Sequence, residues 1–149
     1  MLNKIFSTAD EVSVLVLRVV LAIVFFPHGS QKVLGWFGGY GFGATMDTFT
    51  NTLGIPVIPA FLAIMAEFLG SLGLFVGLLT RVAALGIFSV MAVAVPMLHL
   101  KHGFFMNWFG NQQGEGFEYH LLVMAIAVAL MIKGGGKWSL DAQISKKLE

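Results

Sequence analysis

An apolar stretch from Ile55 to Arg81 constrains the fold of this chain more than any other feature. It carries one carboxylate, Glu67, near its middle, and its prolines stand at the start, where a helix tolerates them. The stretch is long enough for a helix to cross a hydrocarbon core, which takes about 20 residues at about 1.5 Å per residue. A charged carboxylate at that depth costs about 3 kcal/mol unless it is paired or protonated. The sequence therefore predicts a membrane-spanning helix whose neighbours must shield or pair Glu67.

The composition of the whole chain agrees with a membrane protein. Hydrophobic residues make up 57% of the sequence and charged residues 11%, whereas soluble domains carry about 25% charged residues. The net charge of +1 provides no basic surface for nucleic acid. The chain has no cysteine, which excludes disulfides, thiolate metal sites and iron–sulfur clusters held by this chain alone.

Four apolar stretches predict the architecture. We expect an all-α membrane protein, a single four-transmembrane-helix bundle over residues 1–149, with spans at about 12–28, 56–80, 82–100 and 117–133. A short amphipathic helix is expected between the first and second spans, because Met46, Phe49 and Leu53 repeat at helical spacing among polar residues. Pro96 should kink the end of the third span.

The distribution of basic residues predicts the orientation. Four spans place both termini on one side of the membrane. Six basic residues fall on that side and two, Lys32 and Lys101, on the other; the six are Lys4, Arg81, Lys133, Lys137, Lys146 and Lys147. Since basic residues concentrate on the cytoplasmic side, both termini are expected in the cytoplasm of a cell (inner) membrane protein. Two aromatic, glycine-rich loops would then face outward.

A set of motifs along nearly the whole chain resembles one known family. In chain order they are Arg18, Phe26-Pro27-His28-Gly29 with Lys32, a 45–56 block ending Leu-Gly-Ile-Pro, Glu67 with Gly70, Gly73 and Gly77, Thr80-Arg81, His99 with His102-Gly103, Trp108, Glu118-Tyr119-His120, and Gly136 to Asp141. The chain resembles the DoxX family, small four-helix membrane proteins of bacteria and archaea. The resemblance implies a link to oxidoreduction, since some members are subunits of thiosulfate:quinone oxidoreductase and others accompany quinone or oxidative-stress responses.

Glu67 and Arg18 are the candidate catalytic residues. Gly70, Gly73 and Gly77 lie on or beside the Glu67 face and would let a neighbouring helix approach, so Glu67 should point into the bundle. Arg18 lies inside the first span and must snorkel or pair. Two interpretations are open: a structural ion pair between Arg18 and Glu67, or a proton-accepting carboxylate beside a bound quinol.

Every histidine of the chain is predicted to lie near the outer ends of the helices. With two charged neighbours they form a candidate ligand-binding layer of His28, Lys32, His99, His102, Glu118 and His120. Histidine titrates near neutral pH and could relay protons beside a quinone head group. Imidazole also suits a metal or haem, and histidine also occurs as a plain boundary residue. No metal site is assigned from the sequence, and quinone is the favoured ligand. Trp36, Trp108 and Tyr119 are interpreted as interfacial anchors.

Three functions remain open from the sequence. The first is an integral membrane subunit or accessory protein of quinone-linked oxidoreduction, with an oxidoreductase subunit as partner. The second is a small transporter or channel in which Glu67 and Arg18 line a polar path. The third is a structural or assembly protein without catalytic activity. A bilayer is expected around the chain in each case, and self-association into a homo-oligomer fits any of them.

Overall fold

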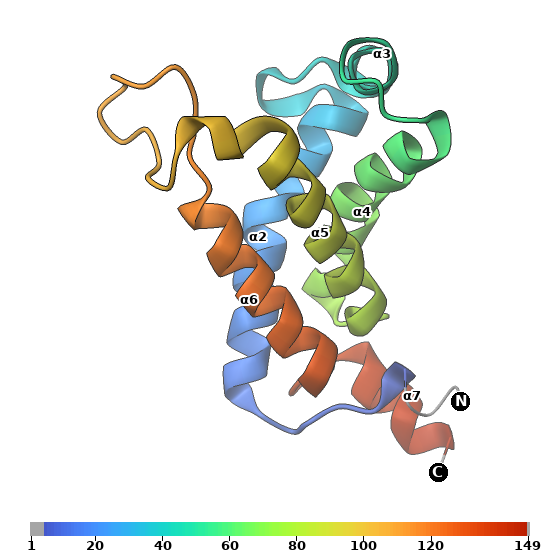
Figure 1. Ribbon diagram of the computed structural model, residues 1–149. Helices are drawn as coiled ribbons and strands as arrows, with labels where there is room; N and C mark the ends of the chain where they lie inside the picture. Colours follow the sequence, from blue (N-terminus) through green and yellow to red (C-terminus); the bar gives the residue numbers. More distant parts are fainter. Residues whose placement is uncertain (1–4, 149) are drawn as a thin grey trace.

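The computed structural model describes residues 5–148, and within this range the chain is helical and has no β-strand. The bundle consists of α2 (Val12–Leu34), α4 (Val57–Val76), α5 (Thr80–Ala94) and α6 (Glu118–Lys133), as Figure 1 shows. Three helices are long and apolar enough to cross a membrane, namely α2, α4 and the stretch Thr80–His102 that begins with α5. The helix α6 has 16 residues. Lys4, one of the basic residues counted above, lies outside the described residues.

The helix boundaries follow glycine and proline. α2 ends at Gly35 and α4 at Gly77, both with the left-handed backbone that glycine adopts without strain. α5 begins after a turn of three residues, 77–79, and this short turn agrees with the nearly adjoining predicted spans 56–80 and 82–100. Its α-helical part ends at Ala94, and the π-helical turn η3 (Val95–His99) and the 3-10 turn η4 (Leu100–His102) continue it. Pro96 lies in η3, and its missing N–H explains why regular α-helical bonding stops there.

Two segments at one end of the bundle join the helices, and we call this end the loop end. The first contains η1 (Trp36–Gly38), α3 (Gly41–Asp47) and the π-helical turn η2 (Thr48–Thr52). A short helix was predicted at residues 44–53, and the observed helical segment begins slightly earlier, at Gly41. The second is the loop of residues 103–117, which extends away from the bundle in Figure 1.

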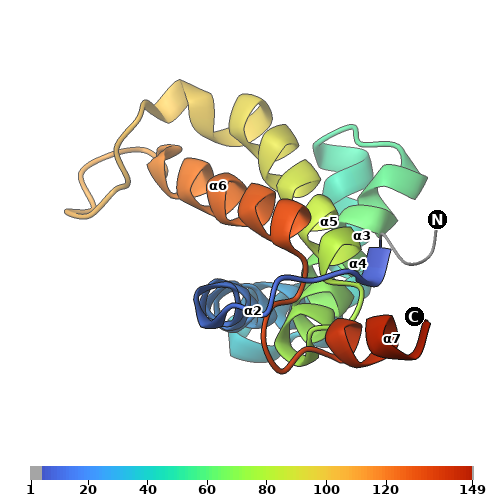
Figure 2. The same cartoon turned by 90° about the horizontal axis from the view of Figure 1, so that it is seen from below.

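The first and last described segments of the chain lie together at the opposite end, which we call the terminal end. Figure 2 shows the segment leading into α2 and the helix α7 (Leu140–Leu148) lying across this end. The Ala9 amide donates to the Lys133 carbonyl at 2.9 Å. The Asp141 carboxylate is 1% exposed and accepts hydrogen bonds from the Leu79 and Thr80 amides at 2.7 and 2.9 Å. Asp141 therefore caps the start of α5 from a distant part of the sequence.

The core lies where α2, α4, α5 and α6 meet. Its buried apolar residues are Val14, Leu21, Ala22, Phe25, Leu74, Ala84, Ile87, Met91, Val123, Ala127 and Leu130. Two close helix approaches flank Glu67. A Cβ on Gly29 of α2 would lie 2.6 Å from the Phe68 Cα of α4, and a Cβ on Gly86 of α5 would lie 3.0 Å from the Ala66 Cβ. Because both approaches occur within one residue of Glu67, three helices surround this carboxylate.

Candidate ligand-binding site

A large apolar cavity with a polar inner end lies among the four bundle helices. Its volume is about 1480 Å³, more than the 300–1,000 Å³ that is usual for small-molecule pockets. Most of its wall comes from apolar residues of α4 and α5, including Leu62, Leu69, Leu85 and Val93, which are also exposed on the outside of the bundle. The cavity is therefore partly a groove between these two helices. Its polar side chains come from all four bundle helices, from η3 and from the loop before α6, and α5 contributes only Ser89.

The predicted buried carboxylate has a partner, Lys32. Glu67 is 4% exposed, so the prediction that it points into the bundle is confirmed. Lys32 Nζ lies 2.5 Å from Glu67 Oε2, and the lysine side chain is 23% exposed. Lys32 follows Gly29 by three residues, so the close approach of α2 to α4 at Gly29 brings the ammonium group to Glu67. Both residues line the cavity.

The expected ion pair between Arg18 and Glu67 is not formed, and this corrects the sequence interpretation. Arg18 Nη1 instead donates to the carbonyl oxygens of Leu74 and Phe75 at 2.6 and 2.8 Å, at the C-terminal end of α4. Arg18 lies nearer the terminal end than Glu67, and its Nη1 is paired there with carbonyls of the last turn of α4, while its buried Nε has no partner. It does not line the cavity, whereas Glu67 does.

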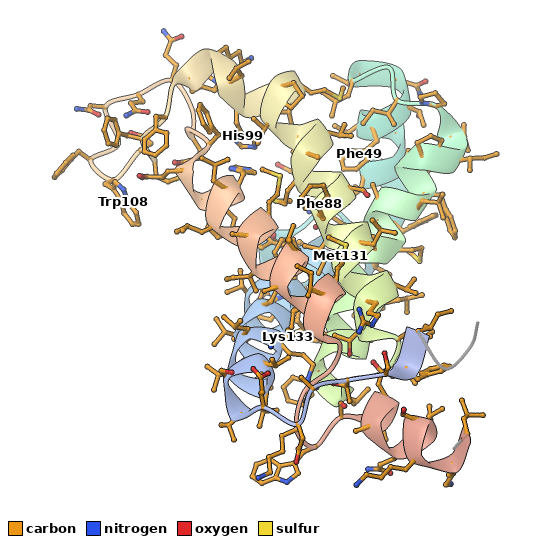
Figure 3. The ribbon with its side chains drawn as sticks, turned by 60° about the horizontal axis from the view of Figure 1, so that its bottom comes forward. Phe49, Phe88, His99, Trp108, Met131 and Lys133 are labelled. Carbon is orange, nitrogen blue, oxygen red and sulfur yellow. The ribbon has the colours of Figure 1, made fainter. Side chains whose placement is uncertain are left out.

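Three of the four histidines line the cavity. His120 is 6% exposed, and its ring centroid lies 3.9 Å from that of His99, which belongs to η3. Figure 3 shows His99 at the loop end, opposite the start of α6. His99 Nδ1 lies 2.9 Å from the Glu115 carbonyl oxygen. Because a carbonyl accepts and cannot donate, this nitrogen carries a proton, which leaves Nε2 of a neutral His99 ring as an acceptor. His28 lies at an exposed edge of the cavity.

His102 and Glu118 lie outside the cavity and shape the 103–117 loop. Glu118 Oε1 accepts hydrogen bonds from the Met106 amide at 2.8 Å and from Trp108 Nε1 at 3.1 Å. The His102 ring packs so closely on Gly114 that a Cβ there would lie 2.5 Å from Nε2. The structure thus brings together Glu67, Lys32, His28, His99 and His120 of the predicted set, and it places Arg18, His102 and Glu118 elsewhere.

Tyr119 is a cavity residue that the sequence analysis interpreted as an interfacial anchor and did not include in the ligand-binding set. Its hydroxyl is buried and has no hydrogen-bond partner. Consecutive helical residues differ in direction by about 100°, so the neighbouring His120 gave no reason to expect both side chains in one cavity. A triple of His, Cys, Asp or Glu arranged to hold a metal is not found among residues 5–148.

The site joins an ion pair, three histidines and a tyrosine hydroxyl to a long apolar groove. Such an arrangement can hold an amphipathic molecule with polar atoms at the inner end and an apolar part along α4 and α5. Carboxylate, imidazole and phenol groups can also exchange protons with a bound molecule.

Comparison with known proteins places this chain in a family. The DoxX family model matches residues 13–100, which is more than half of the chain. A Haemophilus influenzae protein of unassigned function is 32% identical over 96% of this chain and 90% of its own length. The Bacillus subtilis "Putative oxidoreductase CatD" is 32% identical over 87% of this chain and 83% of its own length. The Escherichia coli "Inner membrane protein YqjF" is 27% identical over 93% of this chain and 96% of its own length. No solved structure matches. The chain therefore belongs to the DoxX family of membrane proteins.

Proposed function

We propose that this protein binds a membrane quinone in the cavity and serves as a subunit or accessory protein of quinone-linked oxidoreduction in the inner membrane. One observation carries the proposal: the buried Glu67–Lys32 ion pair lines a large, mostly apolar cavity that His120 and Tyr119 also line. A quinone combines a flat ring bearing two oxygens with a long apolar tail. The polar end suits the ring and the groove between α4 and α5 suits the tail.

The proposal includes four spans, with α6 as the fourth. At about 1.5 Å per residue a helix of this length reaches about 24 Å, less than the roughly 30 Å of a hydrocarbon core. Its packing against α5 and α2 within the bundle core supports the assignment, as does its apolar sequence. The segment α3–η2 would lie on the membrane surface at the loop end.

The proposed orientation puts both termini in the cytoplasm. The terminal end carries Lys133, Lys137, Lys146 and Lys147, and the loop end carries Lys32 and Lys101. This excess of basic residues at the terminal end supports the assignment. The Escherichia coli relative named as an inner membrane protein supports the choice of membrane.

In this proposal Glu67 accepts a proton from a ring hydroxyl, and Lys32 holds the carboxylate in place. Lys32 thus takes the role first assigned to Arg18, because it is the cation that contacts Glu67. The Bacillus subtilis relative with an oxidoreductase name supports a redox setting. Since this chain has no cysteine, electron transfer through thiols would belong to a partner subunit.

The test is ligand retention and rebinding. Protein purified in mild detergent is extracted with organic solvent, and the extract is analysed by mass spectrometry for quinones while an optical spectrum reports haem. A quinone analogue is then titrated against wild type and Glu67→Gln. Glu11→Gln makes the same chemical change at a residue that does not line the cavity, so it should leave binding unchanged. Absence of quinone in the extract together with absence of analogue binding would refute the proposal. Solute or proton flux in vesicles that Glu67→Gln abolishes would establish the transporter alternative instead.

A second candidate function has its own observation. The 103–117 loop exposes large aromatic side chains at its tip, with Phe105 67%, Trp108 78% and Phe109 90% exposed. Figure 3 shows Trp108 on the part of this loop that projects from the bundle. Such a surface suits the docking of a partner subunit in assembly. A co-purifying protein that is lost in a Phe109→Ser variant, but kept in Glu67→Gln, would favour this function.

A further inference from the structure

The α6 wall of the cavity holds two buried polar atoms that no other protein group satisfies. They are the Tyr119 hydroxyl and His120 Nδ1, and both residues line the cavity. His120 is 94% buried on its 6% exposure, so bulk water does not solvate this nitrogen. Native proteins pair nearly all buried polar atoms, and an exception inside a cavity points to a bound group.

The surroundings of these atoms limit what could satisfy them. The neighbouring His99 ring is committed to the Glu115 carbonyl through Nδ1, and Lys32 is committed to Glu67. Tyr119, His120 and the ion-paired Glu67 all line the same cavity. A ligand atom that contacts Tyr119 and His120 would therefore share this cavity with the proposed proton acceptor.

The chemistry of the two groups selects a kind of ligand atom. A tyrosine hydroxyl both donates and accepts, and Nδ1 of a neutral histidine donates in one tautomer and accepts in the other. Together they can bind an oxygen that is a carbonyl in one redox state and a hydroxyl in the other, by exchanging donor and acceptor roles.

We propose that Tyr119 and His120 form the binding subsite for one ring oxygen of a quinone or hydroquinone, on the α6 side of the cavity. This inference rests on the proposed function and adds the residues that orient the ring. The shared chemistry is the ring oxygen, which a membrane quinone or a small soluble quinone could supply.

The test uses Tyr119→Phe, which removes the hydroxyl and no packing atoms. Because the hydroxyl has no protein partner, the variant should fold with unchanged melting behaviour. Tyr40→Phe is the matched control, since Tyr40 is 87% exposed and does not line the cavity. Two probes are titrated, a tailed naphthoquinone and a naphthalene with the same tail. Loss of one good hydrogen bond should raise the Kd of Tyr119→Phe for the naphthoquinone about tenfold and leave the naphthalene Kd unchanged.

The outcomes separate this inference from the proposed function. If wild type binds the naphthoquinone and Tyr119→Phe binds it as tightly as Tyr40→Phe does, the subsite is refuted while the proposed function stands. If wild type binds neither probe, the proposed function fails and the subsite with it. A tail-free naphthoquinone distinguishes the two ligand sources: binding as tight as that of the tailed probe indicates a soluble quinone, and much weaker binding indicates a membrane quinone. In either case the tenfold effect of Tyr119→Phe supports the subsite.

Discussion

The ion pair between Lys32 and Glu67 should dominate the stability of the bundle at the loop end. Removing one partner of a buried pair typically destabilises by about 3–5 kcal/mol, because an uncompensated charge stays behind. The two partners differ in exposure, since Glu67 is 4% exposed and the Lys32 side chain is 23% exposed. Lys32→Met leaves the deeply buried carboxylate unpaired and should lower the free energy of unfolding by nearly this full amount. Glu67→Gln leaves an ammonium group that can reach solvent, so we expect the free energy of unfolding to fall by only about 2 kcal/mol.

A double-mutant cycle tests this reasoning. The free energy of unfolding is measured by detergent titration for wild type, both single variants and Lys32→Met/Glu67→Gln. The double variant buries no charge at this position, so its loss should be about 2 kcal/mol smaller than the sum of the single losses. Arg18→Met combined with Glu67→Gln should be additive within about 0.5 kcal/mol, because Arg18 bonds to the end of α4 instead. Additive losses for Lys32 and Glu67, or strong coupling between Arg18 and Glu67, would show that the pairing argued here is wrong.

Three further predictions concern the scaffold. Gly29→Ala should destabilise the bundle by about 2 kcal/mol in thermal melts and weaken ligand binding, because its Cβ would lie 2.6 Å from a backbone atom of α4; Gly43→Ala, with open space around it, should melt like wild type. Asp141→Ala should cost about 2 kcal/mol by leaving two amides at the start of α5 unsatisfied, whereas Asp141→Asn, which keeps one acceptor, should cost less; equal losses would contradict the capping role. The hydrogen bond from Lys133, followed by the charge of Lys133, lowers the pKa of Glu11 below its ordinary value of 4.5. The pair therefore adds stability above pH 4.5 that is lost as the pH falls below it, and melts at pH 7 and pH 3.5 should differ less for Glu11→Gln than for wild type.

Local sequence patterns were enough to predict most of the helices. The apolar stretch after Pro56 became α4, and Pro96 marked a change of helix type, because their backbone requirements are local. Two helix ends differ from the predicted spans: α2 continues past residue 28 to Leu34, and α4 ends at Val76, before residue 80. The burial of Glu67 was also predictable, since a carboxylate in an apolar helix must face away from lipid. The extent of the last bundle helix was predicted to within a residue, at 117–133 against Glu118–Lys133.

The partner of Glu67 could not be predicted in the same way. Arg18 and Lys32 lie on the same helix, and hydropathy alone does not specify how α2 is placed along α4. The close approach at Gly29 decides that placement, and it brings Lys32 to the carboxylate while Arg18 reaches the end of α4. The same holds for Tyr119, whose direction depends on the rotation of α6 about its axis.

The amino-acid sequence by itself determined that this chain is an all-helical membrane protein with one carboxylate that had to be enclosed. Hydropathy and the cost of burying charge act along each helix and need no knowledge of its neighbours. The tertiary structure decided which cation encloses that carboxylate, which histidines share a cavity, and that Asp141 caps α5 from the far end of the chain. These contacts depend on helix placement and rotation, which are set by side chains packing between elements distant in sequence.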